Sequence, residues 1–326
     1  MKVLVTGGAG YIGRHTVQSL IEHGHSPVIV DNLVYGHRDF LESAKVPFYV
    51  GDIADSSLLR RVFREHHFDG VMHFSAFAYV GESVRSPDIY YRNNVFGTLE
   101  LLDQCVAAQV QSFVFSSTCA TYGLAQTESI DESHPQNPVN PYGRSKWMVE
   151  QILKDYESAF GIRHVILRYF NAAGAHPNGL IGEDHNPETH LIPLVLDTAL
   201  GRRNEVQIFG TDYDTPDGTC IRDYIHVCDL AAAHILGLEK SIKEETSIIA
   251  NLGNGNGYSV REVINVCRKV TGEDIREMES DRRPGDPPVL VASANLARES
   301  LGWKPEYPDL ETIIRHAYKW HRLRHG

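Results

Sequence analysis

The chain has 326 residues, enough for one large domain or two ordinary ones. Its formal net charge of −11 argues against nucleic acid as a partner, because such surfaces need clustered positive charge. No apolar run reaches the roughly 18 residues of a membrane span, and an expected strand begins at position 3, which leaves no room for a signal peptide. We therefore expect a cytoplasmic protein that contacts neither membrane nor nucleic acid.

The cysteine and histidine patterns indicate neither disulfides nor a metal. The five cysteines are odd in number and include no Cys-x-x-Cys pair, so we expect free thiols in a reducing compartment. The 17 histidines show no His-Glu-x-x-His or other metal-binding spacing, and we expect no metal site.

The first expected strand, Val3–Val5, runs into a turn with three glycines, Gly7, Gly10 and Gly13. Such a turn lets the backbone approach a pyrophosphate, while the N–H groups of the first helical residues, Tyr11 and Ile12, face the anion. The alternative is a strand–helix turn whose glycines serve geometry alone. We interpret the pattern as a dinucleotide-binding turn because it lies between a strand and a helix.

The second expected strand, Val28–Val30, ends in Asp31. An acid at this tip hydrogen-bonds the adenosine ribose and repels a 2′-phosphate, so the sequence favours NAD over NADP. The alternative is an aspartate that only caps the strand.

Apolar runs and helical patterns then alternate through the first half of the chain. Further strands are expected at 48–50, 71–74, 113–115 and 164–167, and helices near 11–23, 55–66, 88–108 and 141–160. The alternation predicts a Rossmann-like, doubly wound parallel α/β sheet with helices on both faces. Ligands bind such sheets at the carboxyl ends of the strands.

The second half of the chain has a different composition. From Gly174 it is rich in Pro, Gly, Asn and Asp, and its elements are shorter. We expect residues 1–174 to form an NAD-binding domain and residues 175–326 mainly a smaller mixed α/β domain that binds the substrate. The apolar run 248–253 indicates that the chain returns to the first sheet near 220–255. A terminal helix over 310–324 is expected to pack through its apolar side.

Two segments carry candidate catalytic residues. Tyr142 and Lys146 stand one turn apart on the helix that Asn140 caps. The lysine ammonium and a positive nicotinamide ring would together stabilise the phenolate, so that Tyr142 accepts a proton at neutral pH. Thr118 follows the strand 113–115 and would hydrogen-bond the reacting substrate oxygen. The alternative for Tyr142 and Lys146 is that the Tyr-x-x-x-Lys spacing arose by chance. The alternative for Thr118 is that its hydroxyl only caps the turn after the strand.

Together the glycine turn, Thr118 and Tyr142-x-x-x-Lys146 resemble the extended short-chain dehydrogenase/reductase family, and within it the 4-epimerases of UDP-sugars. Segments that carry the resemblance span nearly the whole chain, among them 73–76, 115–123, 168–175 and 282–288. The resemblance implies a homodimeric enzyme of galactose metabolism that uses NAD to invert C4 of a UDP-hexose, UDP-glucose to UDP-galactose, through a 4-keto intermediate.

The resemblance also implies roles for individual residues. Besides the glycine turn, Asp31 and the catalytic residues, contacts to NAD would come from Asn32, Asp52, Ile53, Phe74, Ser75, Ala76, Asn94, Tyr169 and Phe170. Besides Thr118 and Tyr142, contacts to the UDP-sugar would come from Asn171, His190, Leu191, Phe209, Arg222, Arg283, Asp286 and Leu290. The two arginines would neutralise the diphosphate within an acidic protein.

Three positions depart from the family pattern. Ala78 stands where many relatives carry a cofactor-contacting lysine, and His190 replaces an asparagine near the phosphates. Leu290 replaces a tyrosine that closes the sugar pocket in some members, and a smaller side chain there would admit an N-acetyl group. UDP-N-acetylglucosamine and UDP-xylose are therefore alternative substrates.

Two other functions are open to the same fold. Related dehydratases have an acid pair directly after the active-site threonine, whereas Cys119 and Ala120 follow Thr118 here, so elimination lacks its proton shuttle. A non-catalytic NAD-binding sensor would keep the glycine turn but would not need Thr118, Tyr142 and Lys146 together.

Overall fold

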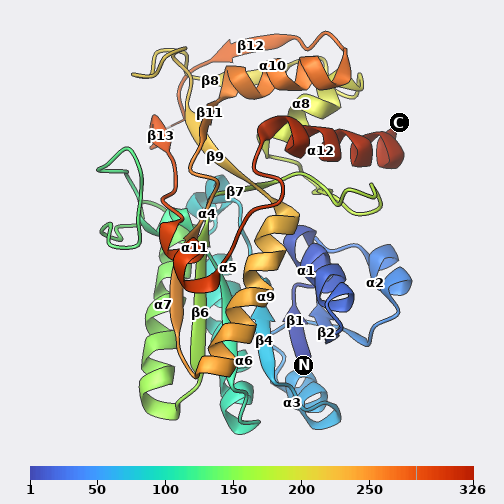
Figure 1. Cartoon of the computed structure of the whole chain (residues 1–326), viewed down its shortest axis with the longest axis vertical. Coiled ribbons are helices and arrows are strands. Elements are labelled where there is room, and N and C mark those ends of the chain that lie inside the picture. Colours follow the sequence, from blue (N-terminus) through green and yellow to red (C-terminus); the bar gives the residue numbers. More distant parts are fainter. Residues whose placement is uncertain (284) are drawn as a thin grey trace.

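Seven parallel strands form the central sheet of the computed structural model, which describes residues 1–283 and 285–326 (Figure 1). Their order is β10-β6-β5-β4-β1-β2-β3. The strands are β1 (Lys2–Thr6), β2 (Ser26–Asp31), β3 (Phe48–Val50), β4 (Gly70–His73), β5 (Ser112–Thr118), β6 (Arg163–Tyr169) and β10 (Ile248–Leu252). The doubly wound parallel sheet is confirmed, and β10 is the expected return of the chain to it.

Helices cover both faces of this sheet. Successive residues of β1 point to opposite faces: Val3 and Val5 pack into one apolar core and Leu4 into the other. The first core is closed by α1 (Tyr11–Glu22) and α9 (Val227–Glu244), with α2 (Arg38–Ala44) and α11 (Asn295–Leu301) at its margins. The second is closed by α3 (Ser56–Glu65), α6 (Gly97–Ala107) and α7 (Pro141–Phe160).

The segment expected as one helix over 88–108 is divided. It forms α5 (Pro87–Tyr90), a π-helical turn (Tyr91–Phe96) and α6, and α4 (Val80–Arg85) precedes it. Within the ranges 1–283 and 285–326, no helix has the length and apolar character needed to cross a membrane.

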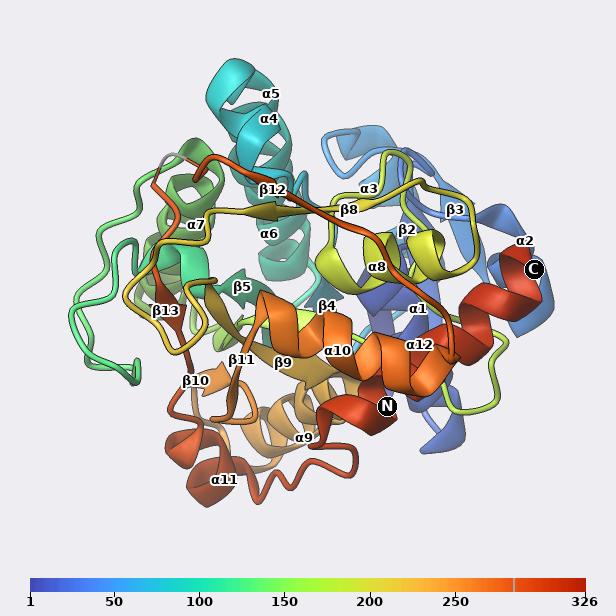
Figure 2. The same cartoon turned by 90° about the horizontal axis from the view of Figure 1, so that it is seen from above.

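A smaller set of elements lies over the carboxyl ends of the central strands. It contains β7 (Asn171–Ala173), β9 (Ile221–His226), β11 (Gly257–Ser259) and β13 (Val289–Leu290), and the pair β8 (Val206–Phe209) with β12 (Glu277–Ser280). Helices α8 (Leu191–Ala199), α10 (Val260–Thr271) and α12 (Leu310–His325) share a separate apolar core with β7, β8, β9 and β11. Figures 1 and 2 show this layer above the end of the sheet where α1 begins.

One buried ion pair connects α7 to the sheet. Arg168 of β6 donates to Glu150 of α7 with Nη2–Oε2 at 2.7 Å, and neither side chain is more than 4% exposed. Glu150 also accepts from the Ser117 hydroxyl at 2.5 Å, and Arg168 donates to the Tyr122 hydroxyl at 2.9 Å. Because every charged atom is paired inside the protein, this network sets the position of α7 against β5 and β6.

Removing one partner of this pair is expected to be costly. Glu150→Gln leaves the Arg168 charge buried without compensation, so the free energy of unfolding should fall by about 3 kcal/mol or more in urea titrations. The double variant Glu150→Leu/Arg168→Met removes both charges, so its free energy of unfolding should fall clearly less than that of Glu150→Gln. Glu239→Gln, at an exposed carboxylate, is the matched control, with a change within about 0.5 kcal/mol. Equal small losses for Glu150→Gln and the control would contradict this account.

Candidate active site

The glycine turn between β1 and α1 has no room for side chains. Gly7 has a φ of +73°, and a Cβ on it would lie 2.6 Å from the Ser75 backbone nitrogen. A Cβ on Gly13 would lie 2.0 Å from the Gly7 carbonyl oxygen. Gly10, the N-cap of α1, offers no side-chain acceptor, and the first turn of the helix contains no acid. The N-terminal N–H groups are therefore available to an anion, and these residues fit the pyrophosphate of NAD.

Asp31 lies at the carboxyl end of β2, where it orders the glycine turn. Its carboxylate accepts the N–H groups of Ala9 at 2.9 Å and Leu33 at 2.8 Å. Burial raises the pKa of Asp31, and these backbone donors oppose the shift. Next to it, Asn32 donates to Asp52 at 3.0 Å. The residues expected around the adenosine thus meet at one corner of the sheet.

The hydrogen bonds of the Asn94 side chain link two segments of the fold, which the sequence did not predict. Its side-chain amide donates to the Phe77 carbonyl and to the Ser145 hydroxyl, both at 3.0 Å, and its carbonyl oxygen accepts the Phe77 N–H at 2.9 Å. The buried amide therefore joins α7 to the segment after β4 that contains Phe74, Ser75 and Ala76. In this structure Asn94 bonds to protein groups and positions that segment.

Thr118 and Tyr142 are brought together at the carboxyl end of β5. Asn140 caps α7 by accepting the Gly143 N–H at 2.8 Å, and Tyr142 lies in the first turn of that helix. Burial raises the pKa of Tyr142 well above its usual value, Tyr169 raises it further, and a hydrogen bond with Thr118 opposes the shift. Without a further positive charge, Tyr142 is a phenol at neutral pH.

Lys146 stands one turn after Tyr142 on α7, where its ammonium was expected to face the phenol. The Lys146 ammonium instead donates to the Ser116 carbonyl oxygen at 2.8 Å and lies 4.8 Å from the centre of the Phe115 ring. Burial lowers its pKa to about 7, and the charge of Glu150 one turn further along α7 raises it. Tyr142 and Lys146 are one turn apart and so lie on the same face of α7. The Lys146 ammonium, however, is hydrogen-bonded to the backbone of β5.

The residues expected to bind the UDP-sugar form two contacting pairs and a small apolar wall. Arg222 of β9 forms an ion pair with Asp286. The guanidinium of Arg283 stacks over the Phe209 ring at 3.9 Å. The wall consists of Leu290 and Cys119 packed on the apolar cluster that contains Phe170.

Two further expected residues lie where β6 passes into β7. Tyr169 shares a hydrogen bond with Ser116, and Asn171 donates to the Asp223 carbonyl at 3.0 Å. Both residues therefore face the carboxyl edge that carries Thr118. His190 and Leu191 stand at the start of α8.

A cluster that the sequence analysis missed lies just before α8. It consists of Glu183, His185, Glu188 and His190, whose nearest nitrogen and oxygen atoms all lie within 4.8 Å of one another. Burial lowers the pKa of His185, but the two carboxylates outweigh it and raise that pKa to about 9. The same carboxylates raise the pKa of His190, whose side chain is half exposed, to about 10. The spacing Glu-x-His-x-x-Glu-x-His is the sequence pattern from which this cluster could have been predicted.

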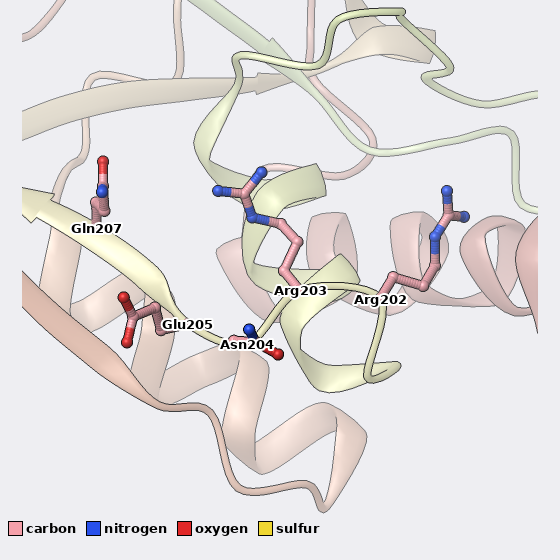
Figure 3. A pocket seen from close by; sticks show the side chains of 5 residues that line it. All are labelled: Arg202, Arg203, Asn204, Glu205 and Gln207. Atoms are coloured by element: carbon pink, nitrogen blue, oxygen red, sulfur yellow. The ribbon is translucent and has the colours of Figure 1, made fainter.

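A surface pocket elsewhere contains none of the expected site residues. It has a volume of about 330 Å³ and lies at the loop between α8 and β8 (Figure 3). Its lining residues are Arg202, Arg203, Asn204, Glu205 and Gln207. We therefore define the candidate active site by the side chains at the carboxyl ends of the strands.

Comparisons with known proteins agree with this geometry. The UDP-glucose 4-epimerase of Halalkalibacterium halodurans is 54% identical over 99% of this chain and 96% of that protein. The structure of UDP-glucose 4-epimerase from Bifidobacterium longum in complex with NAD⁺ and UDP is 41% identical, with a TM-score of 0.94 over 99% of both chains. The UDP-Glc/GlcNAc 4-epimerase of Campylobacter jejuni is also 41% identical, with a TM-score of 0.86 over 99% of both chains. Residues 3–253 match the family model, so the chain belongs to the NAD dependent epimerase/dehydratase family.

Proposed function

We propose that this chain interconverts UDP-glucose and UDP-galactose by inverting C4 of the hexose, with NAD as its resident cofactor. The observation that supports the proposal most is the position of Tyr142 in the first turn of α7 and of Thr118 at the carboxyl end of β5, on the same edge of the sheet as the glycine turn. Full-length similarity to UDP-glucose 4-epimerases supports the same reaction.

When bound between the glycine turn and Tyr142, NAD⁺ would supply reversible hydride transfer at C4, first from one face of the sugar and then to the opposite face. Tyr142 takes the proton of the 4-hydroxyl and gives it back to the same oxygen, which Thr118 holds by a hydrogen bond. Because the pKa of free Tyr142 is raised by burial, it becomes a base only when positive charge enters the site. We assign the ribose of the bound cofactor to Lys146, as the family resemblance implies.

A firm hold on the nucleotide leaves the hexose free to turn. We assign the diphosphate to Arg222 and Arg283 and the uridine to Phe209 and Asp286, since these residues meet in two neighbouring pairs. The ion pair restrains the Arg222 guanidinium and the cation–π contact restrains that of Arg283 before a dianion arrives. The 4-keto sugar can then rotate about its diphosphate link and present its second face.

Elimination in place of epimerisation lacks a proton shuttle here. Cys119 follows Thr118, and burial raises the pKa of its thiol to about 11. A group that stays protonated and apolar at neutral pH cannot act as the base of a dehydratase.

We also propose the organisation in which this reaction occurs. Residues 1–174 with a return near 220–255 would form most of the NAD-binding part, and 175–326 would mainly bind the UDP-sugar. Strands β7 and β9 are exceptions, because they lie in the smaller layer and carry Asn171 and Arg222. Exposed apolar side chains on α4, the π-helical turn and α7 support a homodimer through these helices: Val80, Val84, Phe96 and Met148. Five free cysteines support a cytoplasmic location.

The first test removes the proposed base. Tyr142→Phe should lower the rate of UDP-galactose formation by about 10²–10⁴-fold, because proton transfer from the 4-hydroxyl is lost. NAD binding should persist. Tyr156→Phe, on the same helix but bonded to Asp103, is the control and should keep full activity. Epimerisation by Tyr142→Phe within a few-fold of wild type would remove Tyr142 from its role.

A second test separates function from stability at Lys146. Lys146→Met should lower activity by at least about 100-fold, yet raise the free energy of unfolding of the cofactor-free chain by about 1–2 kcal/mol near pH 7, because it removes a buried charge. The folded pKa of about 7 lies below the unfolded value, so the unfolded state binds more protons between the two and wild type gains stability as pH rises.

The stability difference between Lys146→Met and wild type should therefore shrink from pH 7 toward pH 10 in urea titrations. A difference that is constant across this window would show that the Lys146 ammonium is not destabilised by burial.

A third test concerns the width of the sugar pocket. Leu290 packs beside Cys119, next to Thr118, so Leu290→Tyr should reduce activity on UDP-N-acetylglucosamine while UDP-glucose is still epimerised. Products from UDP-glucose, UDP-N-acetylglucosamine and UDP-xylose would be resolved by NMR. An unchanged ratio of the first two activities would exclude Leu290 as the residue that sets pocket size.

A further inference from the structure

We propose that Glu183, His185, Glu188 and His190 form a binding site for one divalent transition-metal ion, with Zn²⁺ as the best match. This metal cluster lies on the segment between β7 and α8, and its member His190 is also one of the residues expected to contact the UDP-sugar. The proposal does not depend on the proposed function, because metal binding is measured without cofactor or substrate.

The distances within the cluster suit a tetrahedral ion. His190 Nδ1 lies 2.8 Å from Glu183 Oε1 and 3.0 Å from Glu188 Oε1. His185 Nδ1 lies 3.3 Å from Glu183 Oε1 and 3.5 Å from Glu188 Oε2. Four ligands at about 2.0–2.2 Å from a tetrahedral centre are about 3.3–3.6 Å apart, so small movements would admit the ion.

A second observation, at the His185 ring, supports a metal site. Its Nδ1 is buried and has no hydrogen-bond partner, although two carboxylate oxygens lie close to it. The nitrogen is thus near both acids but aligned with neither, as expected for a lone pair directed at a centre that the ligands share.

The chemistry of the donors selects the class of ion. Two imidazole nitrogens and two carboxylate oxygens suit Zn²⁺ and its neighbours, whereas Mg²⁺ and Ca²⁺ prefer oxygen alone. The two carboxylates balance the charge of a divalent ion bound by neutral histidines. Four protein ligands leave no open coordination position, so the site would be structural and not catalytic.

The backbone that carries these ligands is held in place by its surroundings. The Trp320 indole of α12 donates to the Glu183 carbonyl at 3.0 Å. Arg324 donates to Asp184 at 3.0 Å, and the Tyr79 hydroxyl donates to the Pro187 carbonyl at 3.1 Å. Little ordering is therefore left to be done when an ion binds.

The cluster also joins two parts of the proposed active site. The His185 ring meets the edge of Tyr11, the first residue of α1, with centroids 6.1 Å apart. His190 immediately precedes α8. A metal here would fix the start of α8 to the helix whose N-terminus faces the cofactor.

The test measures metal directly. Untagged full-length protein, dialysed against a chelator, would be titrated with Zn²⁺ and with Co²⁺. We expect one ion per chain, a visible Co²⁺ absorption of tetrahedral intensity, and a rise in Tm with Zn²⁺ concentration. His185→Gln and His190→Gln should each weaken Zn²⁺ binding by at least about 100-fold. Because His190 is half exposed, its variant is expected to fold.

His67→Gln, an exposed histidine after α3, is the matched control and should bind as wild type. The competing arrangement has two protonated histidines paired with the carboxylates and no ion. Zn²⁺ stoichiometry far below one per chain would establish that arrangement and overturn the proposal. Zn²⁺ binding that His185→Gln and His190→Gln leave as strong as His67→Gln would overturn it equally.

Discussion

The active site depends on the buried pair between Glu150 and Arg168. Tyr142, Lys146 and Glu150 follow one another at intervals of four along α7, so whatever holds Glu150 also sets the other two. Glu150 is held by a guanidinium from β6 and a hydroxyl from β5. The same contact that stabilises the helix therefore places the phenol beside Thr118 and the ammonium beside Ser116.

The interior of this site disfavours charge on two of the candidate catalytic groups. Burial disfavours both the phenolate of Tyr142 and the ammonium of Lys146, and it shifts their pKa values toward the neutral forms. An added positive charge next to Tyr142 would lower the pKa of the phenol and favour the phenolate. The base would thus be active only when the oxidised cofactor is in place, which avoids an unpaired buried phenolate in the empty chain. The carboxylate of Glu150, one turn further along α7, stabilises the ammonium form of Lys146.

Much of the fold and part of the candidate site could be predicted from local patterns. Gly7 and Gly13 of the predicted turn leave no room for a Cβ, and Asn140 caps the helix that the sequence predicted. Other features depend on residues far apart in the chain. Asn94 bonds Phe77 and Ser145, and Arg168 reaches Glu150 only because β5 and β6 pair beside α7. The cluster from Glu183 to His190 is local in sequence, but its loop is held by Trp320, Arg324 and Tyr79, which no spacing rule includes.

The sequence by itself determined the parallel sheet, the glycine turn and the order in which the candidate catalytic side chains follow the strands. These are properties of a few neighbouring residues, since glycine, N-cap and alternation signals act over one or two turns. Tertiary structure alone decided where the Lys146 ammonium points, how far burial shifts the pKa of Tyr142, and which acids meet which histidines before α8. Those outcomes depend on desolvation and on partners that folding brings from distant segments, and no local pattern contains them.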